Sequence, residues 1–131
     1  MPYAHPIEVR FSDLDAMGHV NNATMLSLVE QARYKWWQIL LAGRPFQAEG
    51  FLLARTEIDY RTPILLGDEV LVELRCTRMG GSSFDLGFRV TRGEGGECFA
   101  EGKTVQVMLD FEANRPKAIS ADVRAWLETQ A

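Results

Sequence analysis

The sequence predicts an α+β fold in which one long helix covers one face of a twisted, five-stranded antiparallel sheet. Apolar residues recur at steps of three and four between positions 23 and 41, as in a helix with a wide buried face. Five other segments alternate apolar and polar residues, which is the pattern of half-buried strands. With 131 residues, 47% of them hydrophobic, the chain suits one core, so we expect a single domain over 1–131.

The first strand is expected over 7–11, where apolar and polar residues alternate. The helix follows from about Ala23 to Leu41, and either Asn21 or Asn22 is a natural N-cap for it. Gly43 then ends the helix.

The second half of the chain is expected to form a meander. Its strands are predicted at 52–60, 70–76, 84–90 and 99–109. Two glycine-rich turns, 79–82 and 93–96, supply the positive φ angles that tight hairpins need. Gly87 and Gly102 lie inside strand patterns and indicate a bulge or a close backbone approach. Ser120 is expected to cap a short C-terminal helix.

Composition and charge argue against several classes of protein. A formal net charge of −4, with no basic run longer than two residues, argues against a nucleic-acid-binding surface. No apolar stretch approaches the roughly 20 residues that a membrane span needs, and the N-terminus lacks a basic segment followed by an apolar one. We therefore expect a cytoplasmic protein without a membrane span. Cys76 and Cys98 have no metal-type spacing and are expected to be reduced core thiols.

The segment from 13 to 25 is the strongest candidate for chemistry. It contains, in order, Asp13, Asp15, Gly18, His19, Asn21 and Asn22. A carboxylate directly before a helix lies beside the exposed backbone N–H groups of the helix N-terminus. Such a pair of groups can polarise a carbonyl and attack it.

Several stretches carry a family resemblance. The first two are Val9-Arg10-Phe11-Ser12-Asp13-Leu14-Asp15-Ala16-Met17-Gly18-His19-Val20-Asn21-Asn22 and Glu30-Gln31-Ala32-Arg33. The later ones are Tyr60-Arg61-Thr62-Pro63-Ile64, Gly67-Asp68-Glu69-Val70 and Gly81-Ser82-Ser83-Phe84. On these residues, essentially the whole chain resembles the hotdog-fold acyl-CoA thioesterases of the 4-hydroxybenzoyl-CoA thioesterase type.

The resemblance implies a hotdog fold and hydrolysis of an acyl-CoA thioester without a cofactor or a metal. In that family the second aspartate of the Asp-x-Asp-x-x-Gly pattern is the catalytic carboxylate, which assigns this role to Asp15, as nucleophile or general base. The family also binds the thioester carbonyl with a backbone N–H at the start of the central helix, a position near Asn22. We expect Gly18, Asn21 and Asn22 to contact the substrate. Many relatives have an aromatic residue in the stretch after the glycine, whereas this chain has His19 and the Asn21-Asn22 pair. The identity of the acyl group therefore stays open.

Three acidic or imidazole groups have both a functional and a structural interpretation. Asp13 is expected to be structural; in the functional interpretation it points to the same side as Asp15 and shares a proton with it. His19 is either a turn residue or a general acid for the departing thiolate. Glu30 either pairs with Arg33 or Arg55, or orients the attacking water. The irregular spacing of this segment argues against a metal site built from its two aspartates and its histidine.

Basic side chains at exposed strand positions are candidates for binding the coenzyme A phosphates. They are Arg61, Arg89 and Lys103. An aromatic group in the later turns of the helix is expected to pack against the core rather than to form an acyl pocket. It consists of Tyr34, Trp36 and Trp37.

A single copy of this fold leaves sheet edges and apolar strand surface uncovered. We therefore expect a homodimer or homotetramer that pairs sheets edge to edge. Two other functions stay open, because one fold hosts several. One is a hotdog dehydratase or hydratase that acts on an acyl thioester, and the other is a non-catalytic acyl-CoA-binding module. An acyl carrier protein in place of coenzyme A is also compatible with the sequence.

Overall fold

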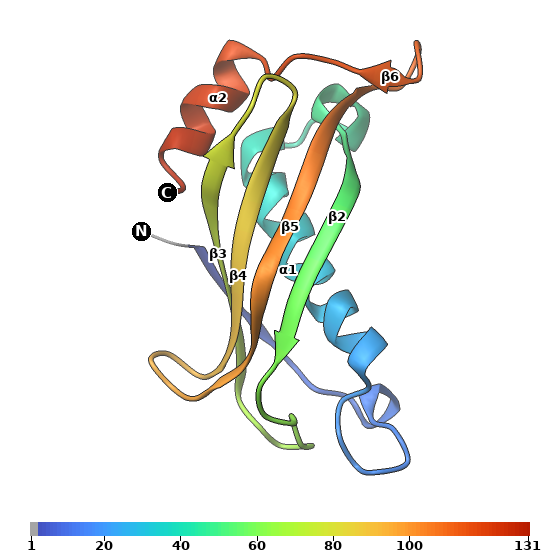
Figure 1. Cartoon of the computed structure of the whole chain (residues 1–131), viewed down its shortest axis with the longest axis vertical. Helices are drawn as coiled ribbons and strands as arrows, with labels where there is room; N and C mark the ends of the chain where they lie inside the picture. The colour runs from blue at the N-terminus through green and yellow to red at the C-terminus, as the bar shows by residue number, and fades with distance from the viewer. Residues whose placement is uncertain (1–2) are drawn as a thin grey trace.

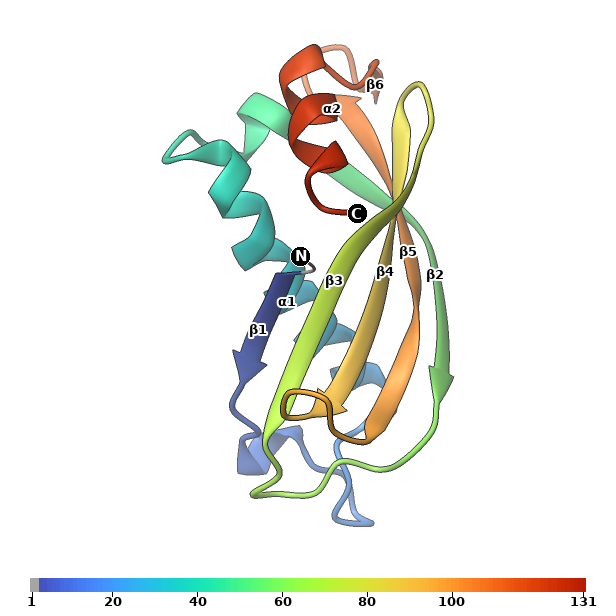
Figure 2. The same ribbon diagram turned by 90° about the vertical axis from the view of Figure 1, so that its left-hand side faces the viewer.

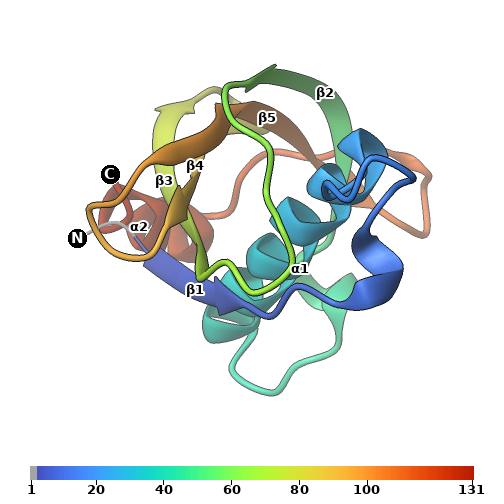
Figure 3. The same ribbon diagram turned by 90° about the horizontal axis from the view of Figure 1, so that it is seen from below.

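The structure is a computed structural model, described over residues 3–131, in which an antiparallel sheet curls around one long helix (Figures 1 and 3). The helices are α1 (Asn22–Leu41), α2 (Ala121–Glu128) and two short 3₁₀ segments, η1 (Phe11–Asp13) and η2 (Phe46–Glu49). The strands are β1 (Tyr3–Ile7), β2 (Phe51–Tyr60), β3 (Val70–Met79), β4 (Ser83–Arg92), β5 (Cys98–Asp110) and β6 (Arg115–Pro116). The expected hotdog arrangement is confirmed.

The sheet has the strand order β1-β3-β4-β5-β2, and every neighbouring pair is antiparallel. β1 and β2 are therefore its two edges. β6 adds a two-residue pairing to the end of β5 and is the strand that the sequence pattern did not predict. α1 lies along the concave face of the sheet, and α2 packs at one end of it (Figure 2).

The expected position of the first strand, 7–11, is wrong, because β1 ends at Ile7. The pairing stops there since Ile7 lies opposite Val70, the first residue of β3. The chain then turns, and the backbone N–H of Arg10 donates to Oδ2 of Asp13 at 2.8 Å to close η1. A local hydrogen bond thus overrides the alternating pattern.

α1 begins one residue before its expected start and ends at the expected residue. The buried face of α1 is wide, and its members recur at steps of three and four: they are Met25, Leu28, Val29, Ala32, Arg33, Trp36, Trp37 and Leu41. Arg33 is the exception in chemistry, since a charged side chain that is 6% exposed occupies an otherwise apolar face. No helix within residues 3–131 is long and apolar enough to cross a membrane.

The tryptophans of α1 build the aromatic end of the core. Trp36 and Trp37 are fully buried. The ring of Trp37 stacks on Phe84 of β4 with 5.5 Å between centroids, and Trp36 lies 4.7 Å from Trp126 of α2. The expected packing role is confirmed for both tryptophans, whereas Tyr34 is half exposed.

The two hairpin turns differ in backbone conformation. Gly93 and Gly95 have φ angles of 63° and 70°, as expected for the turn between β4 and β5. Gly80 and Gly81 do not have positive φ angles, so that expectation is wrong for the turn between β3 and β4. The Gly80 N–H instead donates to the carbonyl of Ser83 at 2.7 Å, which closes the turn.

Gly102 of β5 marks a close backbone approach, as expected. A Cβ atom at this position would overlap the backbone carbonyl oxygen of Glu57 on β2. The register shifts of the sheet fall elsewhere, including one between Cys76 and Arg78. Gly102 therefore allows β5 and β2 to approach closely, and it does not mark a bulge.

Both cysteines are free thiols. Cys76 is buried in the core, and burial raises the pKa of its thiol. Cys98 is half-buried and lies outside the apolar core, so the expectation of a core thiol is wrong for it. Burial raises the pKa of the Cys98 thiol as well.

Candidate active site

A tight turn between η1 and α1 holds Asp15. Its backbone N–H donates to the carbonyl of His19 at 2.8 Å, and the Gly18 N–H donates to the Asp15 carbonyl at 3.0 Å. Gly18 has a φ angle of 79°, which a glycine adopts without strain. Oδ1 of Asp15 accepts the N–H groups of Met17 at 2.9 Å and His19 at 3.3 Å. The exposed carboxylate is thus oriented through one oxygen, and Oδ2 has no hydrogen-bond donor within residues 3–131.

The helix that follows begins with an amide cap. Oδ1 of Asn21 accepts the N–H groups of Ala23 at 2.8 Å and Thr24 at 3.4 Å, which confirms Asn21 as the N-cap. The Asn21 N–H donates to the carbonyl of Asp13 at 2.9 Å, so the cap is tied to η1. In the part of the chain that the structure describes, the N–H of Asn22 has no acceptor. It is a free donor at the positive end of the helix.

One open pocket of about 310 Å³ brings these groups together. The turn before α1 and the end of β2, which contribute to it, lie at the lower end of the ribbon in Figure 1. Asp15, His19 and Asn22 line this pocket. The other lining residues are Val20, Met25, Tyr60, Arg61, Thr62, Pro63 and Ile64. The Val20 N–H donates to the Ile64 carbonyl at 2.9 Å, which fastens the turn of Asp15 to the segment after β2.

Tyr60 is a site residue that sequence reasoning missed. Its hydroxyl, at the end of β2, donates to the carbonyl of Asn22 at 2.9 Å. This bond fixes the first turn of α1 against the end of β2, and it engages the carbonyl of Asn22 rather than its N–H. The signal was the Tyr60-Arg61-Thr62-Pro63-Ile64 stretch, which supported the family resemblance without indicating a place in the pocket.

Asp13 is structural, as expected. It is buried, and its carboxylate accepts the Arg10 backbone N–H at 2.8 Å and the Arg10 guanidinium Nη2 at 3.0 Å. The Arg10 side chain holds the pKa of Asp13 below its ordinary value. The two aspartates of the motif therefore differ in environment, since Asp13 is buried and paired whereas Asp15 is exposed in the pocket.

The structure does not bring Glu30 into this pocket. Glu30 follows Asn22 by eight residues, which is about 12 Å along a helix. It borders two other hollows between α1 and β2, together with Arg33. Within the described residues it forms no ion pair to Arg33 or Arg55, and Arg55 instead pairs with Glu57 at 2.5 Å.

Of the basic candidates, only Arg61 lines the Asp15 pocket. It is exposed and lies 3.8 Å from Asp59 and 3.5 Å from Glu101. Lys103 pairs with Asp85 and Glu57 on the outer, helix-free face of the sheet. Exposed pairs of this kind contribute little to stability, so Arg61 can exchange its partners for a ligand.

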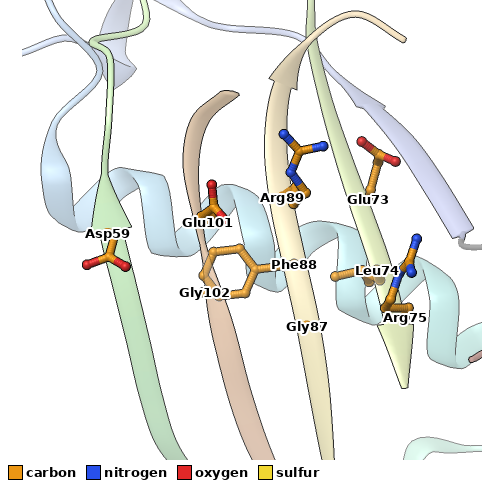
Figure 4. A pocket seen from close by; sticks show the side chains of 9 residues that line it. All are labelled: Asp59, Glu73, Leu74, Arg75, Gly87, Phe88, Arg89, Glu101 and Gly102. Carbon is orange, nitrogen blue, oxygen red and sulfur yellow. The ribbon is translucent and has the colours of Figure 1, made fainter. Parts of the chain in front are cut away.

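Arg89 borders a larger hollow, of about 430 Å³, on the outer face of the sheet (Figure 4). Gly87 lies in the middle of it and leaves room because it has no side chain. The rim mixes charges of both signs from four strands, and α1 passes behind the sheet in this view. None of the residues of the Asp15 pocket borders this hollow. The structure therefore separates Arg89 from the predicted site.

No group of three or more His, Cys, Asp or Glu side chains within residues 3–131 is arranged to hold a metal ion. Asp13 and Asp15 do not converge, because the Asp13 carboxylate is held by Arg10. Among the residues that line the pocket, Asp15 supplies the one carboxylate and His19 the one imidazole.

The chain is similar to known thioesterases both in sequence and in fold. The family model of the thioesterase-like superfamily matches residues 9–127. The chain is 31% identical over 132 residues to 1,4-dihydroxy-2-naphthoyl-CoA hydrolase of Synechococcus sp. (strain CC9605), covering 94% of this chain and 87% of that one. It is 29% identical over 127 residues to the long-chain acyl-CoA thioesterase FadM of Escherichia coli (strain K12), covering 93% and 94%. A solved thioesterase from Thermus thermophilus, complexed with coenzyme A and zinc, is 39% identical, with a TM-score of 0.86 and coverage of 97% and 92%.

Proposed function

This chain belongs to the thioesterase-like superfamily and is a thioester hydrolase, and we propose that it cleaves acyl-CoA to a carboxylic acid and free coenzyme A with Asp15 as its catalytic carboxylate. One observation carries the proposal. The pocket that Asp15 lines is also lined by Asn22, whose backbone N–H has no acceptor in the described chain. A carboxylate oxygen and a free N–H donor in one pocket are the two groups that attack on a thioester carbonyl requires.

Asn22 supplies the electrophilic half of the reaction. Its N–H donates to the thioester carbonyl oxygen, and the bond strengthens as negative charge develops on that oxygen. The positive end of α1 adds to this stabilisation. Tyr60 acts as a positioning residue, because its hydroxyl holds the Asn22 carbonyl and with it the first turn of the helix.

Asp15 supplies the attacking half by one of two routes. In the first, Oδ2 attacks the carbonyl carbon, the carbon–sulfur bond breaks, the coenzyme A thiolate leaves, and water then hydrolyses the resulting anhydride. In the second, Oδ2 takes a proton from a water molecule, the hydroxide attacks the same carbon, and the carbon–sulfur bond breaks to release the carboxylic acid and the coenzyme A thiolate, which takes up the proton. Both routes need Oδ2 free and the carboxylate oriented, which the two hydrogen bonds to Oδ1 provide.

His19 has a smaller role in this proposal. Its imidazole is half-buried in the pocket, and its backbone already holds Asp15 through two hydrogen bonds. A coenzyme A thiolate leaves readily without a general acid. We therefore expect a His19→Gln variant to retain turnover within about tenfold, below the usual effect of losing an acid catalyst.

Two further features of the substrate belong to the proposal. The names of the relatives include a naphthoyl-CoA hydrolase and a long-chain acyl-CoA thioesterase, so both aromatic and long aliphatic acyl-CoAs are candidates.

Arg61 at the pocket rim is the candidate for a coenzyme A phosphate. An Arg61→Ala variant should then raise KM for acyl-CoA with little change in kcat. We place the reaction in the cytoplasm, where coenzyme A thioesters are made and used.

The experiment that tests the proposal is thiol release from short, long and aromatic acyl-CoAs, for the wild type and Asp15→Asn side by side. We expect release by the wild type from at least one class and its loss in the variant. Turnover by the variant at the wild-type rate would exclude Asp15. Tight acyl-CoA binding by the wild type without any release would instead support a binding module.

A further inference from the structure

The turn between β2 and β3, at the lower end of the ribbon in Figure 2, is closed by the side chain of Asp68. Oδ2 of Asp68 accepts the Leu65 N–H at 2.8 Å, and the Asp68 N–H donates to the Leu65 carbonyl at 3.1 Å. Gly67, which lies between the two, has a φ angle of 92°, which a glycine adopts without strain. Asp68 thus engages both backbone groups of Leu65 and sets the conformation of this turn.

Arg92, at the end of β4, anchors the Asp68 carboxylate to the sheet. Its Nη1 donates to Oδ1 of Asp68, the oxygen that the Leu65 N–H does not use. The Asp68 side chain is 13% exposed, and the guanidinium carbon of Arg92 lies 4.8 Å from the centroid of the buried Phe99 ring. One oxygen of this carboxylate therefore holds the turn while the other holds the sheet, in a charge-assisted contact.

The turn reaches the candidate active site because Leu65 lies opposite His19. These two residues form an isolated antiparallel bridge, next to the hydrogen bond from the Val20 N–H to the Ile64 carbonyl at 2.9 Å. Ile64 is fully buried, whereas Leu65 and Leu66 are 47% and 52% exposed. Packing therefore fixes the segment as far as Ile64, and hydrogen bonds fix it beyond that residue.

His19 in turn holds Asp15. The His19 carbonyl accepts the Asp15 N–H at 2.8 Å, and the His19 N–H donates to Oδ1 of Asp15 at 3.3 Å. A continuous series of contacts thus leads from Asp68 to the Asp15 carboxylate. Asp68 does not line the Asp15 pocket itself, so it can act on the reaction only through this series.

We propose that Asp68 is a positioning residue of the thioester hydrolase, which orients the Asp15 carboxylate by holding the segment opposite the Asp15 turn. The inference rests on the proposed role of Asp15 in catalysis. Attack on the thioester carbonyl depends on the direction of Oδ2 of Asp15, and a displacement of about 1 Å can lower a rate by about 100-fold. Substrate binding depends less on this direction. Loss of the Asp68 carboxylate should therefore lower kcat and leave KM nearly unchanged.

The first arm of the test is thiol release by three variants, with the acyl-CoA that the wild type hydrolyses fastest. Asp68→Ala removes both contacts of the carboxylate, so kcat should fall by about tenfold or more while KM stays within about threefold of the wild type. Asp68→Asn keeps an oxygen for the Leu65 N–H, and Arg92→Met keeps that bond but removes the anchor. Each of these two variants should lower kcat by only about threefold. The conservative asparagine thus restores most of the rate.

The second arm is hydrogen–deuterium exchange, which does not depend on turnover. The backbone N–H groups of Asp15 and Val20 are both hydrogen-bonded in the wild type, and they should exchange faster in Asp68→Ala. Asp110→Ala is the matched control, because the Asp110 carboxylate also closes a turn but does not line the pocket. This control should keep the wild-type kcat and the wild-type exchange at both amides.

The outcomes separate positioning from general stability. Wild-type kcat in a folded Asp68→Ala variant, a rise in KM without a fall in kcat, unchanged exchange at the two amides, or an equal fall in kcat in Asp110→Ala would each overturn the proposal. If Asp68→Ala does not fold, Arg92→Met decides, and wild-type kcat in that variant would overturn it. If the wild type releases no thiol or Asp15→Asn keeps its turnover, the proposed function fails, and the exchange arm alone still decides whether Asp68 holds the Asp15 turn.

Discussion

Replacing Asp15 by Asn separates the chemical role of this residue from its role in the turn. An asparagine keeps a carbonyl oxygen at Oδ1, so the hydrogen bonds from Met17 and His19 are retained. It has no carboxylate oxygen to attack a carbonyl or to take a proton. We therefore expect the free energy of unfolding to change by less than about 0.5 kcal/mol, whereas kcat falls by about 100- to 10,000-fold. In activation free energy that loss is about 3–5 kcal/mol.

Two further variants make the measurement specific. Asp15→Ala removes both hydrogen bonds as well as the carboxylate, so it should lose about 1–2 kcal/mol of stability in addition to its activity. Asp110 forms a turn of the same kind, because its Oδ1 accepts the N–H groups of Glu112 and Ala113 at 3.0 Å each. Asp110→Asn should therefore keep both stability and turnover.

The assay combines thiol release, which gives kcat and KM, with urea unfolding followed by tryptophan fluorescence. We expect Asp15→Asn and Asp110→Asn to unfold alike and to differ in kcat. A folded Asp15→Asn protein with kcat within tenfold of the wild type would refute the catalytic assignment. An Asp15→Asn protein as unstable as Asp15→Ala would refute the account of the turn.

Three other variants, with one control, test the supports of the site and of the sheet. Asp13→Asn should cost about 1 kcal/mol at neutral pH, because Arg10 is exposed and screened. Arg10 lowers the pKa of Asp13 in the folded state, so this stability is present above pH 3.8, the ordinary pKa, and is lost as the pH falls through the lower pKa of the folded state. The free energies of unfolding of wild type and variant, measured in urea, should therefore converge in acid. Gly102→Ala should lower the free energy of unfolding by about 1–3 kcal/mol or more, because its Cβ overlaps the Glu57 carbonyl. Gly81→Ala, with open space around its Cβ, should change the free energy of unfolding little in the same urea measurement. Asn21→Asp should leave the helix as stable or slightly more stable but lower kcat by about tenfold, because a negative charge then stands beside the thioester oxygen; equal turnover would contradict this.

Regular sequence patterns predicted the long elements of the fold well. The helix was expected from Ala23 and begins at Asn22, because a buried stripe over five turns defines a helix whatever surrounds it. The first strand was misplaced because the alternation after Ile7 has no partner strand beyond Val70. Strand length depends on the neighbour, and a single segment carries no information about where its neighbour ends.

The site was predicted in part, for a similar reason. Asp15, His19 and Asn22 are close in sequence, and the structure brings them into one pocket. Tyr60 was missed because it stands 38 residues from Asn22, and nothing in the sequence pairs a tyrosine hydroxyl with a backbone carbonyl. Glu30 shares the helix with Asn22 but lies two turns away, beside the hollows between α1 and β2.

The choice of cap explains how the helix end can serve both stability and binding. An aspartate at position 21 would also cap α1, but its charge would occupy the positive end of the helix. Asn21 instead satisfies the N–H groups of Ala23 and Thr24 with a neutral oxygen, and the first turn of α1 contains no acid. The Asn22 N–H and the helix dipole are thus left free, and the proposed mechanism uses both for the developing charge of the substrate. Among the described residues that line the pocket, the only acid is then Asp15 itself, placed on the turn outside the helix, where it can approach the carbonyl carbon without competing for the same donor.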